Sequence, residues 1–148
     1  MAQAGLQDIV TELADQIRAT LETAITVQVE PRMVPMPSPL TIDIYPGDLA
    51  RDAESAAFDD LSGGYLLTVR ARINTPDYDA AYDILLALMD DTDPLCLAQA
   101  ILDDPTLNGY ASSMDVRDQS GLRGYETLDG TGAFLGFQLT ALVLAGDS

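Results

Sequence analysis

Residues 65–73 alternate strictly between two kinds of side chain, and this alternation constrains the fold more than any other feature of the sequence. The odd-numbered positions are Tyr65, Leu67, Val69, Ala71 and Ile73. The even-numbered positions between them are Leu66, Thr68, Arg70 and Arg72. Because successive side chains of a strand point to opposite faces, the pattern predicts a strand with one face on the core and a partly polar outer face. The core face of such a strand needs a covering layer.

Two segments have the helical spacing that this layer requires. Near the N-terminus, apolar residues recur at intervals of three and four, at Leu6, Ile9, Val10, Leu13, Ile17 and Leu21. The Thr-Pro-Asp sequence at 75–77 is typical of a helix start. We expect this second helix to end near residue 89, with one face formed by Tyr78, Tyr82, Leu85, Leu86 and Met89. A shorter helix is expected over 93–102, beginning at an Asp-Pro pair.

The rest of the chain reads as strands and long connections. Strands are expected at 25–29, 40–45, 110–117 and 133–144, and the last is apolar on both faces, which predicts a buried strand near the sheet centre. Loops are expected at 31–39, which holds four prolines, at 48–61, and at 118–132, which is rich in Gly, Ser and Asp. The sequence therefore predicts one α+β domain over 1–148, a mostly antiparallel sheet packed on one side by an N-terminal and a central helix.

The charged residues exclude several kinds of chemistry. The chain has 24 acidic residues and seven arginines, with no lysine or histidine, and its formal net charge is −17. Catalytic units that need histidine, Schiff bases and P-loops are therefore excluded. Cys96 is the only cysteine, which rules out an intrachain disulfide and a thiolate zinc cluster, and its neighbours Leu95 and Leu97 favour a buried structural thiol. So acidic a chain is also not expected to bind the nucleic-acid backbone.

The acidic clusters give no specific site. The Asp-Asp-Thr-Asp sequence at 90–93 lacks the spacing of an EF-hand loop, and Asp93 is better explained as a helix cap. We therefore expect no catalytic residue, metal or cofactor, and a protein that is not an enzyme. No segment has the roughly 20 apolar residues of a membrane span, and residues 1–10 lack the basic start of a secretory signal.

Arginine is the scarce cation of this sequence, so its positions indicate candidate contacts. Arg70 and Arg72 fall on the same strand face, about 7 Å apart. They can pair with neighbours in the sheet, or they can contact an acidic patch on another copy of the subunit, and the residues alone leave both interpretations open. The candidate subunit-interface residues are Arg32, Arg70, Arg72, Arg117 and Arg123.

Two of the expected loops, 31–39 and 118–132, are longer than simple links. Loops of this length are usually functional or disordered, so each is either an assembly loop or a floppy surface loop. The candidate assembly-loop residues are Pro35, Pro37, Ser120 and Gly121.

The order of these segments resembles the tail terminator proteins (also called tail completion or minor tail proteins) of long-tailed phages and related tailed viruses. Four blocks and the closing apolar strand carry the likeness, which covers roughly residues 6–144. The blocks are LTIDIYPG at 40–47, LTVRARINT at 67–75, YDAAYDILL at 78–86 and AILDDPTLNG at 100–109.

The resemblance implies a structural virion protein of the tail or neck, assembled in the host cytoplasm. A small α+β subunit would form a homo-oligomeric ring, a hexamer in this family, that caps the tail tube, stops its polymerisation and joins it to the head-side connector. The implied partners are the tail tube protein and a connector or neck protein, while DNA passes through the lumen without specific binding. No catalytic residues exist to carry over.

Two other functions stay open at this point. A head-completion or connector (neck) ring protein of the same virion has a similar size and style. An acidic metal-binding protein or a carboxylate-dependent hydrolase is the alternative from another class. The 19 aspartates and the absence of lysine also suggest a virus of a halophilic host, since an acidic surface stays hydrated in salt, although GC-rich coding explains this composition equally well.

Overall fold

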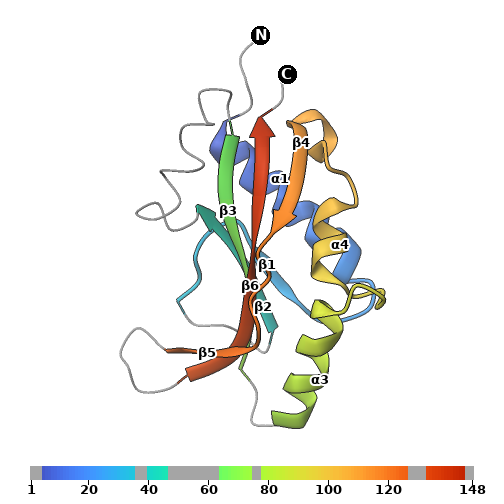
Figure 1. Ribbon diagram of the computed structural model, residues 1–148, viewed down its shortest axis with the longest axis vertical. Coiled ribbons are helices and arrows are strands. Elements are labelled where there is room, and N and C mark those ends of the chain that lie inside the picture. The colour runs from blue at the N-terminus through green and yellow to red at the C-terminus, as the bar shows by residue number, and fades with distance from the viewer. Residues whose placement is uncertain (1–4, 36–39, 47–63, 75–77, 127–132, 146–148) are drawn as a thin grey trace.

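Six strands pair into one sheet within the residues that the structure describes, a computed structural model covering 5–35, 40–46, 64–74, 78–126 and 133–145 (Figure 1). The strands are β1 (Gln28–Glu30), β2 (Leu40–Pro46), β3 (Gly64–Ile73), β4 (Ala111–Arg117), β5 (Arg123–Glu126) and β6 (Ala133–Ala145). Their order is β1-β2-β3-β6-β4, and β5 also pairs with β6. Only β1 and β2 run parallel; the other pairs are antiparallel.

The helices form the second layer, so the fold is α+β as the sequence predicts. They are α1 (Leu6–Leu21), α3 (Tyr78–Met89), α4 (Leu97–Leu102) and a short 3₁₀ helix, η3 (Leu107–Gly109). In Figure 1, α1 passes behind the strands and α3 lies beside the lower half of β6. The side-chain amide of Gln16 ties α1 to α4 by donating hydrogen bonds to the carbonyls of Ala100 (3.2 Å) and Ile101 (2.6 Å).

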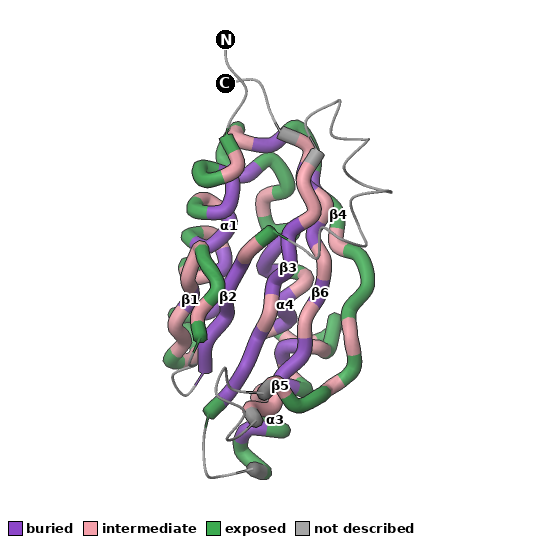
Figure 2. The backbone as a smooth tube through the Cα atoms, turned by 90° about the vertical axis from the view of Figure 1, so that its left-hand side faces the viewer, coloured by how far each residue is buried: buried purple, intermediate pink, exposed green. Residues whose placement is uncertain are grey.

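The core lies between the two layers, where the predicted alternation of β3 is confirmed. Leu67, Val69 and Ala71 are fully buried, and so are the residues that pair with them on the neighbouring strands, apart from the exposed Pro46 at the end of β2. These buried neighbours are Ile42, Ile44, Phe137, Leu139 and Ala141. Six residues of α1 are buried in the same core: Ile9, Val10, Leu13, Ala14, Ile17 and Leu21. Figure 2 shows buried and exposed residues alternating along the backbone of α1.

The prediction for the buried face of α3 is confirmed for Leu85 but wrong for Tyr82 and Leu86. Tyr82 and Leu86 are 40% and 42% exposed, whereas Ala81, Leu85 and Leu88 are buried. The helix is apolar over most of its circumference, so its hydrophobic spacing does not fix its rotation. Packing against α4 and β6 fixes it instead. The expected start at 75–77 lies outside the described residues.

Two further boundaries differ from the sequence prediction. The helix α4 begins at Leu97 and not at the Asp-Pro pair, because Asp93 folds the chain into a turn: its carboxylate accepts the backbone N–H of Leu95 (2.8 Å), and its carbonyl accepts that of Cys96 (3.0 Å). The strand β1 begins at Gln28, three residues after the expected start at Ile25, and ends at Glu30. The expected loop at 48–61 lies outside the described residues.

The segment 118–132 is not simply a loop, since it contains β5. Arg123–Glu126 pairs with the first part of β6, while β4 pairs with its last part. Between these two strands, Ser120 bonds to Gln138 twice: its N–H donates to the Gln138 carbonyl (2.8 Å), and its hydroxyl oxygen accepts the Gln138 N–H (3.0 Å). This edge of β6 is therefore paired along much of its length.

Gly136 allows β3 and β6 to approach closely, and its replacement should destabilise the protein. A Cβ atom there would lie 2.2 Å from the carbonyl oxygen of Ala71 and 3.1 Å from the Cα of Arg72. We expect Gly136→Ala to lower the free energy of unfolding by about 2 kcal/mol or more, because the strands must move apart. Urea denaturation measures this loss. Gly121→Ala is the matched control, since its Cβ would meet no atom within 4 Å, and equal stability of the two variants would contradict the prediction.

Candidate functional site

The face of the sheet opposite the helices carries the arginines in register across four strands. Asp43 of β2 pairs with Arg70 of β3, which pairs with Gln138 of β6. In the next row, Arg72 of β3 pairs with Gly136 of β6, which pairs with Arg123 of β5. Since residues two apart on a strand share a face, these rows place three arginines on one side of the sheet.

The carboxylate of Asp43 is the centre of this arrangement. Its Oδ1 accepts a hydrogen bond from Arg70 Nε (3.1 Å). Its Oδ2 accepts bonds from Arg70 Nη2 (2.5 Å), from Arg72 Nη2 (3.1 Å) and from the backbone N–H of Val34 (2.9 Å). Arg72 also donates to the carbonyl oxygen of Val34. One carboxylate thus joins β2, β3 and the segment that follows β1.

Two guanidinium groups share this single carboxylate, so the cluster carries a net positive charge beneath the surface. Asp43 is fully buried, and the side chains of Arg72 and Arg70 are 3% and 13% exposed. The Nε of Arg72 is buried and has no acceptor among the described residues. Burial lowers the pKa of Arg72, although Asp43 opposes it. Burial also acts to lower the pKa of Arg70, but its hydrogen bonds to Asp43 and that charge outweigh it and raise the pKa.

Two tyrosines extend this cluster to the surface. The guanidinium carbon of Arg70 lies 5.0 Å from the ring centroid of Tyr45 and 5.6 Å from that of Tyr125. Arg123 lies 5.3 Å from the same Tyr125 ring. The Tyr125 hydroxyl donates to Gln138 Oε1 (2.9 Å), which fixes the ring. We call Tyr45, Arg70, Arg123 and Tyr125 the arginine–tyrosine cluster; cation–π contacts of this kind hold arginine side chains in place.

The five candidate interface arginines differ in their burial and in their ion pairs. Arg72 is buried and pairs with Asp43 on the neighbouring strand of its own subunit, which is the first of the two interpretations left open by the sequence; its role at an interface stays a prediction. Arg70 also pairs inside the subunit but keeps a little exposure. Arg117 is exposed, with its Nε 4.0 Å from Asp115, while Arg32 and Arg123 are exposed and form no ion pair with any described residue.

The candidate assembly-loop residues also differ from one another. Ser120 is half-buried and bonded to β6, so it belongs to the sheet edge and not to a free loop. Gly121 and Pro35 are exposed, and Pro37 lies outside the described residues.

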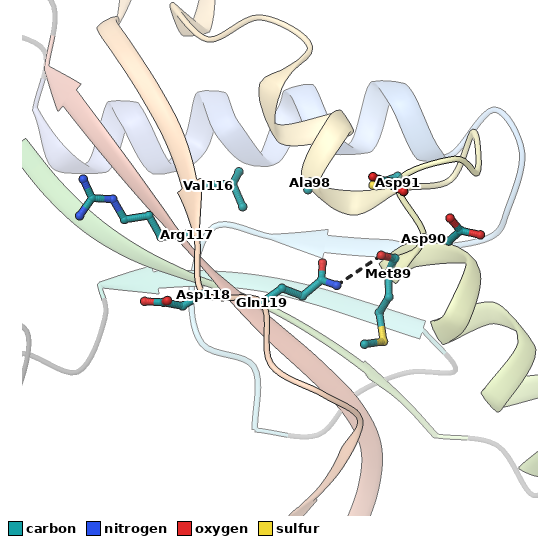
Figure 3. A pocket seen from close by; sticks show the side chains of 9 residues that line it. Met89, Asp90, Asp91, Ala98, Val116, Arg117, Asp118 and Gln119 are labelled. Carbon is teal, nitrogen blue, oxygen red and sulfur yellow. Dashed lines mark hydrogen bonds between the residues drawn. The ribbon is translucent and has the colours of Figure 1, made fainter.

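A separate cavity of about 520 Å³ lies beside α4. Figure 3 shows side chains that line it. Among its lining residues are Met89, Asp90, Asp118 and Gln119, and the Gln119 amide donates to the Met89 carbonyl (3.3 Å). Hydrogen bonds from Thr92 lower the pKa of Asp90, which is thus a turn-forming carboxylate. Cys96 also lines the cavity but is buried, and no group of three potential ligands among the described residues could hold a metal ion. The cavity offers no nucleophile paired with a base.

Sequence reasoning missed Asp43 and two members of the arginine–tyrosine cluster, Tyr45 and Tyr125. A signal for Asp43 exists, since a carboxylate between Ile42 and Ile44 in a strand with buried neighbours needs a cationic partner. The arginines two apart in the next strand are the obvious source. Tyr125 had no such signal, because it lies in a segment that reads as a loop.

Comparison with protein-family models gives no match for this chain, and comparison with curated proteins gives none either. Within the described ranges, none of the helices has the length and hydrophobicity to span a membrane.

Removing the charge of Asp43 should cost far more stability than removing that of an exposed aspartate. Asp43→Asn leaves two largely buried guanidinium groups without their counter-ion, and we expect a loss of about 3–5 kcal/mol in the free energy of unfolding. Asp115→Asn removes the same charge beside the exposed Arg117 and should cost less than about 1 kcal/mol. Urea denaturation of both variants checks this. A loss below 1 kcal/mol for Asp43→Asn would show that the buried pairs contribute little.

Proposed function

We propose that this protein is a ring-forming tail terminator of a tailed virus, which caps the tail tube, stops its polymerisation and joins it to the head-side connector. The observation that carries the proposal is the position of the quoted sequence blocks in the fold. The 40–47 block includes all of β2 and the 67–75 block includes most of β3; the two strands pair with each other, and the ion pairs of Asp43 join them. The 78–86 and 100–109 blocks supply most of α3 and the α4–η3 region.

The chemistry of the described residues supports an assembly function. The most elaborate polar arrangement, around Asp43, has its carboxylate fully occupied by donors from the same subunit. Such a network fixes strands and orients surface side chains, and it leaves no general base free to act on a substrate. At the surface, this network holds arginine and tyrosine side chains in fixed positions. The combination of these two residue types is typical of protein contacts.

The negative charge suits a ring through which DNA passes. Each subunit carries −17, so acidic side chains facing a lumen would repel the phosphate backbone and let it slide. The virion location, the ring and its partners all follow from this proposal. The neighbouring alternative, a head-completion or connector ring, differs in its partner and in its symmetry.

The proposal is tested by mixing the purified protein with tail tubes polymerised from the tube protein of the same virus. We expect the protein to bind only at tube ends, to arrest elongation and to appear as a ring in electron micrographs. An unrelated acidic protein of similar size is the control for non-specific adsorption. A protein that stays monomeric and never binds tube ends would contradict the terminator function. A twelve-fold ring on the portal would identify a connector instead.

We propose that the acidic surface adapts the protein to a halophilic host, and the stability in dilute buffer tests this. A subunit with −17 repels itself, and salt screens that repulsion between exposed charges. We expect the midpoint of thermal unfolding to rise steadily between roughly 10 mM and 1 M potassium chloride, where the Debye length falls from about 30 to 3 Å. Differential scanning calorimetry measures this midpoint. A midpoint independent of salt would contradict the halophilic interpretation.

A further inference from the structure

The arginine–tyrosine cluster is a positively charged spot on a strongly acidic protein. Beneath it, Arg70 and Arg72 share one carboxylate, and Arg123 at its edge has no carboxylate partner among the described residues. The Arg72 Nε is also buried and finds no acceptor among the residues that the structure describes. The described part of the subunit therefore does not neutralise this positive potential. An acidic group from outside that part would be attracted to the face of the sheet that carries the cluster.

The helical layer carries a hollow of opposite charge. A cavity of about 480 Å³ lies between α1 and the residues that follow α4, and its acidic lining residues are Glu12, Asp15, Asp103 and Asp104. We call this the acidic hollow. Of the four, only Asp15 forms an ion pair with a described residue, Arg18 (2.7 Å). Hydrogen bonds from Thr106 and Asn108 lower the pKa of Asp104, so its carboxylate is charged at neutral pH.

The two surfaces lie on opposite layers of the same subunit. The arginine–tyrosine cluster belongs to the sheet face away from the helices, and the acidic hollow belongs to the helical layer. A two-fold pairing that places the cluster on its own copy would bring arginine against arginine. Only a head-to-tail contact lets each surface meet its complement, and contacts of this kind generate rings when the rotation closes.

We propose that subunits of this protein bind one another head to tail, with the arginine–tyrosine cluster of one copy seated on the acidic hollow of the next. The proposal rests on the ring of the proposed function and assigns the surfaces that build it. Charge complementarity selects a second copy as the occupant, since this chain itself displays the acidic surface. Arg123 is held against Tyr125, so little side-chain freedom is lost when a carboxylate binds it.

A charge exchange between the two surfaces tests the proposal. Arg123→Glu and Asp103→Arg each place like charges across the contact, and we expect each variant alone to dissociate at least tenfold more readily than the natural protein. A one-to-one mixture of the two variants should recover assembly, because alternating copies restore an opposite pair at every contact. Sedimentation velocity at one fixed salt concentration measures the oligomeric state.

Matched controls separate the contact from net charge. Asp79→Arg makes the same charge change as Asp103→Arg on the exposed start of α3, and Ser113→Glu adds a negative charge at an exposed position of β4. Both should assemble as the natural protein does. Far-ultraviolet circular dichroism of each variant verifies folding, and both Arg123 and Asp103 are exposed, so their replacement should leave the fold intact.

The outcomes separate this contact from the terminator function. An oligomer that neither single variant weakens, a mixture that stays dissociated, or a natural protein that is monomeric at all concentrations would overturn the head-to-tail contact. Loss of tube binding in Arg123→Glu with an unchanged oligomer would also overturn it, by assigning the cluster to another protein. Recovery in the mixture without any binding to tube ends would support the contact and contradict the terminator function.

Discussion

The rest of the structure depends on the buried carboxylate of Asp43. The parallel pairing of β1 and β2 obliges the chain to travel back between them, and Val34 on that path both donates to Asp43 and accepts from Arg72. The carboxylate thereby joins the returning segment to two strands at once. Burying charge is costly, and the site tolerates it because the Asp43 oxygens accept four hydrogen bonds.

The same carboxylate also determines how side chains are oriented at the surface of the sheet. A bidentate contact fixes the plane of the Arg70 guanidinium, whose carbon lies 5.0 Å from the ring centroid of Tyr45 and 5.6 Å from that of Tyr125. Tyr125 belongs to β5, so a charge on β2 is linked to the opposite side of β6 through packed side chains. Gly136 has the complementary role, because only a residue without Cβ lets β6 lie so close to Arg72.

Much of the fold could be predicted because its strongest signals are local. The helical period placed α1, the alternation of side chains placed β3, and the continuous apolar run placed β6. The rotation of α3 about its axis could not be predicted, because the exposed Tyr82 and Leu86 are apolar like the residues of α3 that are buried. The strand β5 was missed because its four residues are held by pairing with β6 and have no hydrophobic period of their own. For the same reason only part of the site could be predicted. Arg70 stands out in the sequence, but Tyr125 lies near Arg70 only because β5 pairs with β6.

The distribution of the arginines bears on the proposed association of so acidic a subunit. Of the six arginines in the described part of the chain, Arg18, Arg70, Arg72 and Arg117 lie within 4.0 Å of carboxylates of their own subunit. The remaining two, Arg32 and Arg123, are exposed. Since copies carrying −17 repel one another as a whole, attraction between them must come from short-range contacts that outweigh the screened repulsion. Such a contact costs least free energy at Arg123, because this side chain is already held on an aromatic ring beside a buried excess of positive charge.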